Sequence, residues 1–188
     1  RDELTILEPY GSNCIRCRST KNSKILDEDW TLLPPKEGAE YSITGDESVA
    51  EITNGMVKVK LEAGNIWYGG IINFYRKDEH ILHTKYEGHY TGRNVHREGD
   101  HYQVKVIFDA HEGEHFYGLG QEQEDQFDRK GSTVNLEHYN TKSAVPVYYS
   151  SMGYGFLWNS PAPGRCETTN NHTMWVSDSA YQADFLVY

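Results

Sequence analysis

The residues His111, Glu112, Gly113, Glu114 and His115 have the spacing H-E-x-x-H, in which two histidines bind zinc and a glutamate is the general base. The motif requires a helix, because a helix places residues four apart on one face. Here a strand-like alternation precedes it, a glycine lies at its centre and an aromatic strand follows. The sequence therefore predicts a hairpin turn with solvated charges, and no metalloprotease site.

Two shorter pairs also have spacings found in metal or redox sites. Cys14 and Cys17 form C-x-x-C, and His80 and His83 form H-x-x-H. Both pairs lie in segments that alternate like strands, where side chains three apart point to opposite faces. Neither pair has further ligands at the spacing that completes a zinc site. We therefore expect no bound metal and no cofactor.

Four carboxylates, Glu122, Glu124, Asp125 and Asp128, lie close together in the sequence. Glycosidases use two carboxyl groups about 5–10 Å apart, one of them with a raised pKa. No apolar wall near this run would raise the pKa of one member. We expect a solvated loop and no catalytic residue, with calcium or sugar hydroxyls as the alternative ligands.

An aromatic cluster near residue 150 could stack on sugar rings or fill a core. Its members are Tyr148, Tyr149, Tyr154, Phe156 and Trp158. Strand alternation puts Tyr148 and Tyr149 on opposite faces, so at most some of these rings can meet a ligand. Core packing is the expected role of the others.

The strands that position these residues are predicted from the alternation of apolar and polar residues with a period of two. In the segment 56–63, Val57, Val59 and Leu61 alternate with charged residues, which is typical of a half-buried strand. Further strands are expected at 4–8, 14–18, 51–53, 71–75, 81–86, 101–110, 145–150, 154–158, 172–176 and 183–187, and an aromatic strand runs through Gly118 and Gly120. The spacing of strands and turns predicts an all-β antiparallel β-sandwich.

Turns are expected at 54–55, 69–70, 98–100, 112–113 and 152–153, where glycine combines with Asn, Gly, Glu, Asp or Met. Little helix is expected, at most one turn at 125–130. The segment 21–47 mixes Pro34 and Pro35 with acidic and small residues, so it is expected to be a long connection.

Composition limits the classes of partner. The 188 residues suit one domain, and the formal net charge of −10 opposes binding to nucleic acid. No apolar run reaches the ~18 residues of a membrane span, so no membrane partner is expected. Three cysteines are an odd set, which favours a reducing compartment such as the bacterial cytoplasm; secretion stays open, since a removed signal leaves no trace.

The most specific stretch runs from His115 to Asn159. It contains Phe-Tyr-Gly-Leu-Gly-Gln, with Gly118, Gly120 and Gln121, then an acidic loop, an Asn ahead of a Val-Pro strand, and Gly-Tyr-Gly-Phe. The glycines indicate a sharp turn or a close backbone approach. This pattern resembles the N-terminal galactose-mutarotase-like β-sandwich (supersandwich) domain of glycoside hydrolase family 31, which contains α-glucosidases and α-xylosidases.

The resemblance implies that this domain and the catalytic residues are separate parts of the parent chain. In that family the catalytic carboxylates lie in a (β/α)8 barrel that follows this domain, and the chain here ends at Tyr188. A loop of the domain helps shape the sugar-binding mouth of the barrel. In family members with a longer loop, an Asp two positions after the Asn that corresponds to Asn140 hydrogen-bonds the sugar. That loop corresponds here to Tyr139, Asn140, Thr141, Lys142 and Ser143, and Lys142 occupies the Asp position.

The sequence thus predicts that residues 1–188 form a single non-catalytic N-terminal domain of a family 31 α-glycosidase. Its expected partners are the barrel of the same parent chain and the oligosaccharide that the parent contacts. A stand-alone carbohydrate-binding module and a mutarotase-like epimerase are the alternatives, the second on fold analogy alone. A structural domain that binds a partner is the plainest alternative.

Overall fold

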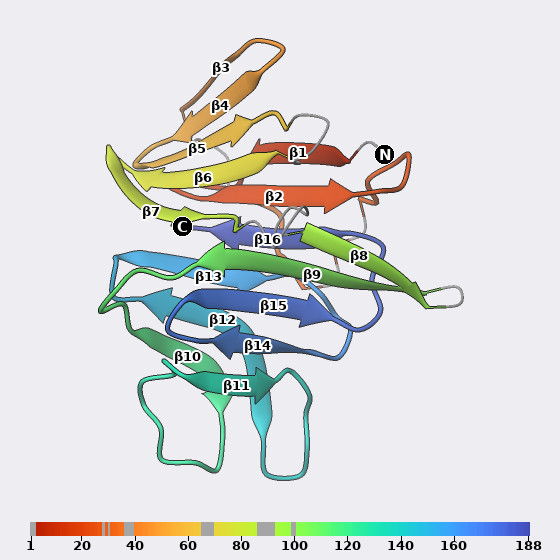
Figure 1. Cartoon of the computed structure of the whole chain (residues 1–188), viewed down its shortest axis with the longest axis vertical. Coiled ribbons are helices and arrows are strands. Elements are labelled where there is room, and N and C mark those ends of the chain that lie inside the picture. The colour runs from red at the N-terminus through yellow and green to blue at the C-terminus, as the bar shows by residue number, and fades with distance from the viewer. Residues whose placement is uncertain are drawn as a thin grey trace.

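Three antiparallel sheets make up the computed structural model, which describes residues 3–27, 29, 31–35, 40–64, 70–85, 93–98 and 101–188, with only the backbone described for 93–98 and 101 (Figure 1). The described residues contain strands, turns and bends but no helix. The all-β antiparallel sandwich expected from the alternation is confirmed.

Two of the sheets face each other as the main sandwich (Figure 1). The six-stranded sheet has the order β1 (Leu4–Pro9), β2 (Ile15–Thr20), β16 (Ala183–Val187), β13 (Tyr154–Trp158), β12 (Ser143–Ser150) and β10 (Phe116–Gln121). The five-stranded sheet has the order β11 (Ser132–Asn135), β14 (Gly164–Thr168), β15 (His172–Ser177), β9 (His101–Asp109) and β8 (Arg93–Glu98).

The third sheet lies across one end of this sandwich, at the upper end of Figure 1. Its order is β3 (Tyr41–Gly45), β4 (Val49–Asn54), β5 (Val57–Glu62), β6 (Ile71–Arg76) and β7 (Glu79–His83). It continues into the five-stranded sheet, because Thr84 forms an isolated bridge with Phe108 and the Lys85 amide donates to the Ile107 carbonyl.

The core lies where the three sheets meet. Phe74 of β6 lies 6.4 Å from Phe108 of β9 and 6.2 Å from Phe185 of β16, measured between ring centroids. Phe108 and Phe185 are 5.5 Å apart in edge-on contact, an arrangement that adds about 0.5–1.5 kcal/mol beyond burial. All three rings are fully buried. The sheets therefore share one hydrophobic cluster.

Most expected strands are present, and several elements differ from the prediction. Four strands were not predicted: β3, β8, β11 and β14. The prediction of a helical turn at 125–130 was wrong, because those residues form bends and a turn. The side chains of β3 are exposed on both faces, although Tyr41 and Ile43 alternate with Ser42 and Thr44. The turns at 69–70 and 98–100 fall partly or wholly outside the described residues.

The interpretation of 21–47 as a plain connection was wrong. It contains β3, and before that strand it is fixed by ion pairs to β2: Asp29 to Arg16 at 2.6 Å and Asp27 to Arg18 at 2.8 Å. Ile25, two residues before Asp27, is buried. Both arginines are themselves buried, so this segment supplies the carboxylates that their guanidinium groups require.

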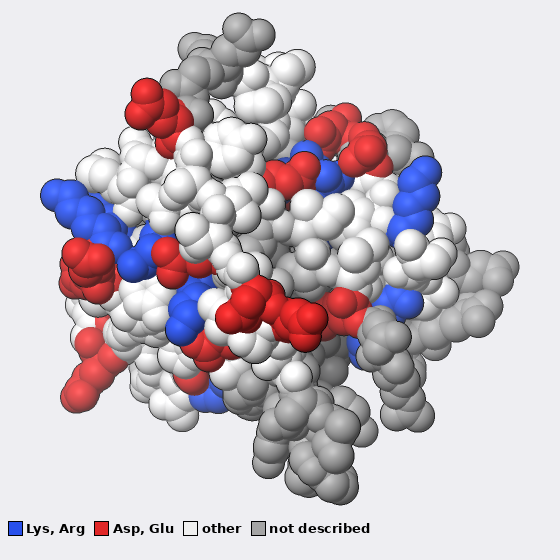
Figure 2. All heavy atoms as spheres, turned by 90° about the horizontal axis from the view of Figure 1, so that it is seen from above, with Lys and Arg blue, Asp and Glu red and all other residues white. Residues whose placement is uncertain are grey.

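Figure 2 shows the molecule from above, and on this face lysines and arginines lie beside aspartates and glutamates. In the part of the chain that the structure describes, no helix is long and apolar enough to cross a membrane.

Candidate functional site

The predicted substrate loop is a tight turn. Tyr139 and Lys142 form an isolated bridge, with amide-to-carbonyl hydrogen bonds of 3.2 and 3.3 Å. Asn140 and Thr141 occupy the corners, and Ser143 begins β12. All five residues except Lys142 are exposed. The turn therefore presents the Tyr139 ring and three short polar side chains at the surface.

Lys142 is the fixed member of this turn. Its Nζ lies 2.9 Å from Glu122 Oε1, and both side chains are only 15% exposed. Glu122 follows β10, so the ion pair ties the 139–143 turn to the loop between β10 and β11. The two loops extend together at the lower end of Figure 1. We call these two segments, 121–130 and 139–143, the loop face.

The glycine turn at the end of β10 has the unusual backbone that its sequence predicts. Gly118, Leu119 and Gly120 have φ values of 121°, 66° and 92°, all in the region that favours glycine. The pairing with β12 shifts register between the two glycines. A Cβ on Gly118 would lie 2.7 Å from the Val147 carbonyl oxygen. The backbones of β10 and β12 therefore also approach each other closely here, as the sequence predicts.

Two groups hold this turn in place. The buried Arg129 donates from Nε to the Gly118 carbonyl at 3.3 Å, and Gln121 pairs with Ser143 at the end of β10. Leu119 is a residue that sequence reasoning missed: it is fully buried with a positive φ. Only its place between two glycines could have indicated that conformation.

The acidic run divides into two kinds of residue. Glu124 and Asp125 are exposed as expected. Glu122 and Asp128 are not freely solvated: Asp128 accepts from His115 Nδ1 at 2.6 Å and from two backbone amides. Burial alone would raise the pKa of Asp128, but these hydrogen bonds lower it. The prediction of a uniformly solvated loop was wrong for these two.

The H-E-x-x-H segment is also only partly as predicted. Its turn is present at Gly113, but it connects β9 of one sheet to β10 of the other and is therefore no hairpin. Glu114 is 1% exposed and accepts hydrogen bonds from Ser150 and Tyr154, which contradicts the expected solvated charge. This glutamate is bonded inside the core and cannot meet a substrate.

The separation predicted for His80 and His83 was wrong. Their ring centroids lie 5.0 Å apart, and His111 lies 6.1 Å from His80. The β6–β7 pairing shifts register and leaves Ile81 without a partner in β6, so the alternation is displaced by one residue. Among the described residues, no group of three His, Cys, Asp or Glu side chains is arranged to hold a metal ion.

Cys14 lacks the thiolate form that redox or metal chemistry requires. Cys14 and Cys17 are buried and form no disulfide, and burial raises the pKa of the Cys14 thiol to about 12. The thiol is therefore protonated at neutral pH, whereas both nucleophilic attack and metal binding need the thiolate.

The five aromatic side chains divide between the two faces of the sheet, as the alternation predicts. Tyr148 is fully buried and stacks 5.4 Å from Trp175, whereas its neighbour Tyr149 is 55% exposed on the outer face of the six-stranded sheet. Phe156 and Trp158 are buried in the same cluster as Tyr148. Only Tyr149 of the original five is available to a ligand or partner.

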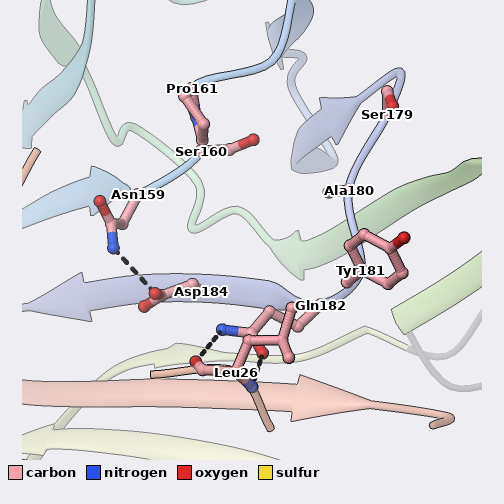
Figure 3. A pocket seen from close by; sticks show the side chains of 9 residues that line it. All are labelled: Leu26, Asn159, Ser160, Pro161, Ser179, Ala180, Tyr181, Gln182 and Asp184. Atoms are coloured by element: carbon pink, nitrogen blue, oxygen red, sulfur yellow. Dashed lines mark hydrogen bonds between the residues drawn. The ribbon is translucent and has the colours of Figure 1, made fainter. Parts of the chain in front are cut away.

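A small pocket that the sequence did not indicate lies beside the end of β13 (Figure 3). Asn159 donates from Nδ2 to Asp184 Oδ2 at 2.8 Å, and Arg16 binds both oxygens of Asp184 at 2.9 and 2.5 Å. Burial alone would lower the pKa of Arg16, but its bonds to Asp184 and Asp29 raise it. The signal available in the sequence was the placement of two arginines, Arg16 and Arg18, in a strand whose other residues are apolar or small.

Comparison with known proteins agrees with this architecture. A "family 31 glucosidase ORF2" described as uncharacterized, from Pseudescherichia vulneris, is 30% identical over 98% of this chain and 38% of its own length. Alpha-xylosidase A of Aspergillus niger is 26% identical, over 98% of this chain and 28% of its own. The chain thus spans well under half of these relatives.

Solved structures give the same result. The crystal structure of a GH31 alpha-xylosidase from a soil metagenome, complexed with xylose, superposes with a TM-score of 0.88 and 27% identity, over 99% of this chain and 31% of that one. Residues 3–167 match the family model described as the glycosyl hydrolase 31 N-terminal galactose mutarotase-like domain. The chain therefore belongs to the family of N-terminal galactose mutarotase-like domains of glycosyl hydrolase family 31.

Proposed function

We propose that this chain is the non-catalytic N-terminal domain of a parent enzyme that hydrolyses α-xylosidic or α-glucosidic bonds. The observation that carries the proposal is the match of nearly the whole chain to one end of family 31 enzymes that are about three times longer. The chemistry of the described residues supports it, because their buried carboxylates are bonded within the structure, as Glu114 and Asp184 show. A glycosidase needs a pair of carboxyl groups facing a substrate.

We further propose that the loop face docks on the catalytic barrel of the parent chain and helps shape its sugar-binding mouth. Phe127 is 84% exposed and Tyr139 is 59% exposed, one ring on each loop. The Glu122–Lys142 pair holds the two loops together as one surface. Interfaces between domains of one chain bury on the order of 600–1,500 Å², which two adjoining loops of this kind can supply in large part.

The docking proposal is tested by splitting the parent chain. Residues 1–188 and the remaining part of the parent are produced as separate polypeptides, mixed, and assayed on aryl α-xyloside and α-glucoside. We expect activity only after mixing, and a weaker response for Phe127→Glu and Tyr139→Glu. The matched control is Tyr41→Glu, because Tyr41 is 56% exposed but lies on β3. Loss of activity with Tyr41→Glu and not with the loop variants would place the interface elsewhere.

A stand-alone carbohydrate-binding module is the second candidate, favoured by the exposed Tyr149 ring on a sheet face. Calorimetric titration with glucose, xylose, maltose and isoprimeverose separates the two. The docking proposal predicts nothing tighter than millimolar, which corresponds to about 4 kcal/mol. Micromolar binding that is lost in Tyr149→Ala supports the module. Trp158 is 1% exposed and cannot belong to such a platform.

A further inference from the structure

We propose that the pocket beside Asn159 binds one neutral sugar ring, as a site separate from the loop face. The pocket has a volume of about 150 Å³ and lies between the end of β13, the start of β16 and Leu26 of the segment that crosses β2. Figure 3 shows Asn159, Asp184, Gln182 and Tyr181 around this space. The proposal does not depend on docking to a barrel.

The polar walls of the pocket are fixed before any ligand binds. Asp184 is 4% exposed and Asn159 is 8% exposed, and each is bonded to the other. Gln182 accepts from the Leu26 amide at 2.8 Å and donates to the Leu26 carbonyl at 3.1 Å. Because these side chains are already ordered, binding a ligand costs less conformational entropy of the protein.

Two side chains of these walls, Asp184 and Asn159, can still form hydrogen bonds with hydroxyl groups of a ligand. A carboxylate oxygen can accept two hydrogen bonds, and Asp184 Oδ1 accepts one, from Arg16 Nε, among the described residues. The Asn159 amide nitrogen carries two protons, and one of them is directed to Asp184. An acceptor and a donor side by side match two neighbouring hydroxyls of a sugar.

Other classes of ligand fit this environment poorly. An anion would meet the Asp184 carboxylate at the pocket wall, and the Arg16 guanidinium that pairs with it is already shared with Asp29. A metal cation would need several oxygen ligands, and Asp184 already binds Arg16 with both oxygens. An apolar ligand would remove water from Asp184 and Asn159 without replacing its hydrogen bonds, which costs free energy.

Size and shape agree with a single ring. A cavity of about 150 Å³ holds a six-membered ring such as benzene, and this pocket is open to solvent, so a larger pyranose can enter with part of its ring while its remaining hydroxyls stay in water. Tyr181 is 57% exposed at the pocket, and its ring lies 6.1 Å from that of Tyr102. An aromatic ring in this position offers an apolar face on which the C–H groups of a sugar can pack.

The test is an NMR titration of the ¹⁵N-labelled chain with D-xylose and with D-glucose. We expect saturating shifts of the Asn159 and Gln182 side-chain amides in the millimolar range, for at least one of the two sugars. Sodium sulfate and calcium chloride are the charged controls and should leave these amides unmoved. Absence of saturable shifts with either sugar, or shifts caused by either salt instead, would overturn the proposal.

Three variants locate the site. Tyr181→Ala should abolish the sugar-dependent shifts, whereas Tyr149→Ala, which removes an equally exposed tyrosine from the outer sheet face, should leave them unchanged. Tyr181→Phe keeps the ring and should retain binding, which separates loss of stacking from loss of folding. Binding that survives Tyr181→Ala, or that is lost in Tyr149→Ala, contradicts the assignment to this pocket.

Discussion

Gly120 is the residue of the glycine turn that tolerates a side chain least. Its φ is 92°, and an added Cβ would overlap the Ser143 carbonyl oxygen and lie 2.7 Å from the Val145 nitrogen. Gly120→Ala should therefore cost more than the 1–2 kcal/mol expected for the backbone conformation alone. The measurement is the free energy of unfolding in urea, taken from the transition midpoint and slope.

Gly113 is the matched control for this substitution. Its φ is 73°, similarly unfavourable for alanine, but nothing lies within 4 Å of the position its Cβ would take. Gly113→Ala should therefore show the conformational cost without the overlap. Equal losses for the two variants would mean that close approach to β12 contributes nothing at Gly120.

The Glu122–Lys142 pair should couple more strongly than an exposed pair. Both side chains are 15% exposed and 2.9 Å apart, so water screens them poorly. A double-mutant cycle with Glu122→Gln and Lys142→Met should give a coupling free energy of about 0.5–3 kcal/mol in thermal or urea unfolding.

The pair Lys58–Asp78 is the control for that cycle, because its atoms are 3.7 Å apart and Asp78 is fully exposed. Its coupling should be smaller. If the Glu122–Lys142 cycle gives no coupling, the two loops are not held together by this pair, and the loop face is not one fixed surface.

At the scale of the strands, the β6–β7 hairpin should respond to acid. Burial lowers the pKa of His80 below its ordinary 6.5, and the neighbouring His83 and His111 lower it further. The other charged groups here are Asp109, which binds His83 at 2.9 Å, and Lys85, which binds Asp109 at 2.7 Å.

The direction of the effect follows from the lowered pKa. Below pH 6.5 the unfolded chain binds a proton at His80 that the folded chain binds less readily, so stability is complete above this range and falls as the pH decreases through it. Urea unfolding as a function of pH measures the loss, which His80→Gln should reduce. The exposed His138 provides the control His138→Gln, which should not reduce it.

For the whole molecule, we predict no glycosidase activity from residues 1–188 alone. The motivation is that the acidic loop has no pair of carboxylates facing a common space: Glu122 is bound to Lys142, and Asp128 to His115. Incubation with aryl α-xyloside and α-glucoside should give no turnover. Turnover that disappears in Glu124→Gln would show that the exposed part of this loop is catalytic after all.

The sequence by itself determined the fold class and most of the strands. Alternation with a period of two is a local signal, because successive side chains of a strand point to opposite faces wherever one face is buried. Segment 57–62 carries it throughout, and segment 101–109 carries it as far as Val106, where the buried Ile107 interrupts it. The pattern from His115 to Asn159 also indicated the family. Its two glycines, Gly118 and Gly120, are part of that pattern because the backbone of this turn has φ values that favour glycine.

Only the tertiary structure decided where the polar side chains go. Glu114 and Arg16 find their partners on segments far away in the sequence, in Tyr154 and Asp184, and no local pattern records contacts 40 and 168 residues apart. One unpaired residue, Ile81, was enough to bring His80 and His83 together against the alternation. Burial of a charge depends on which distant group neutralises it, so the loop pair, the histidine cluster and the pocket appear only once the sheets are packed.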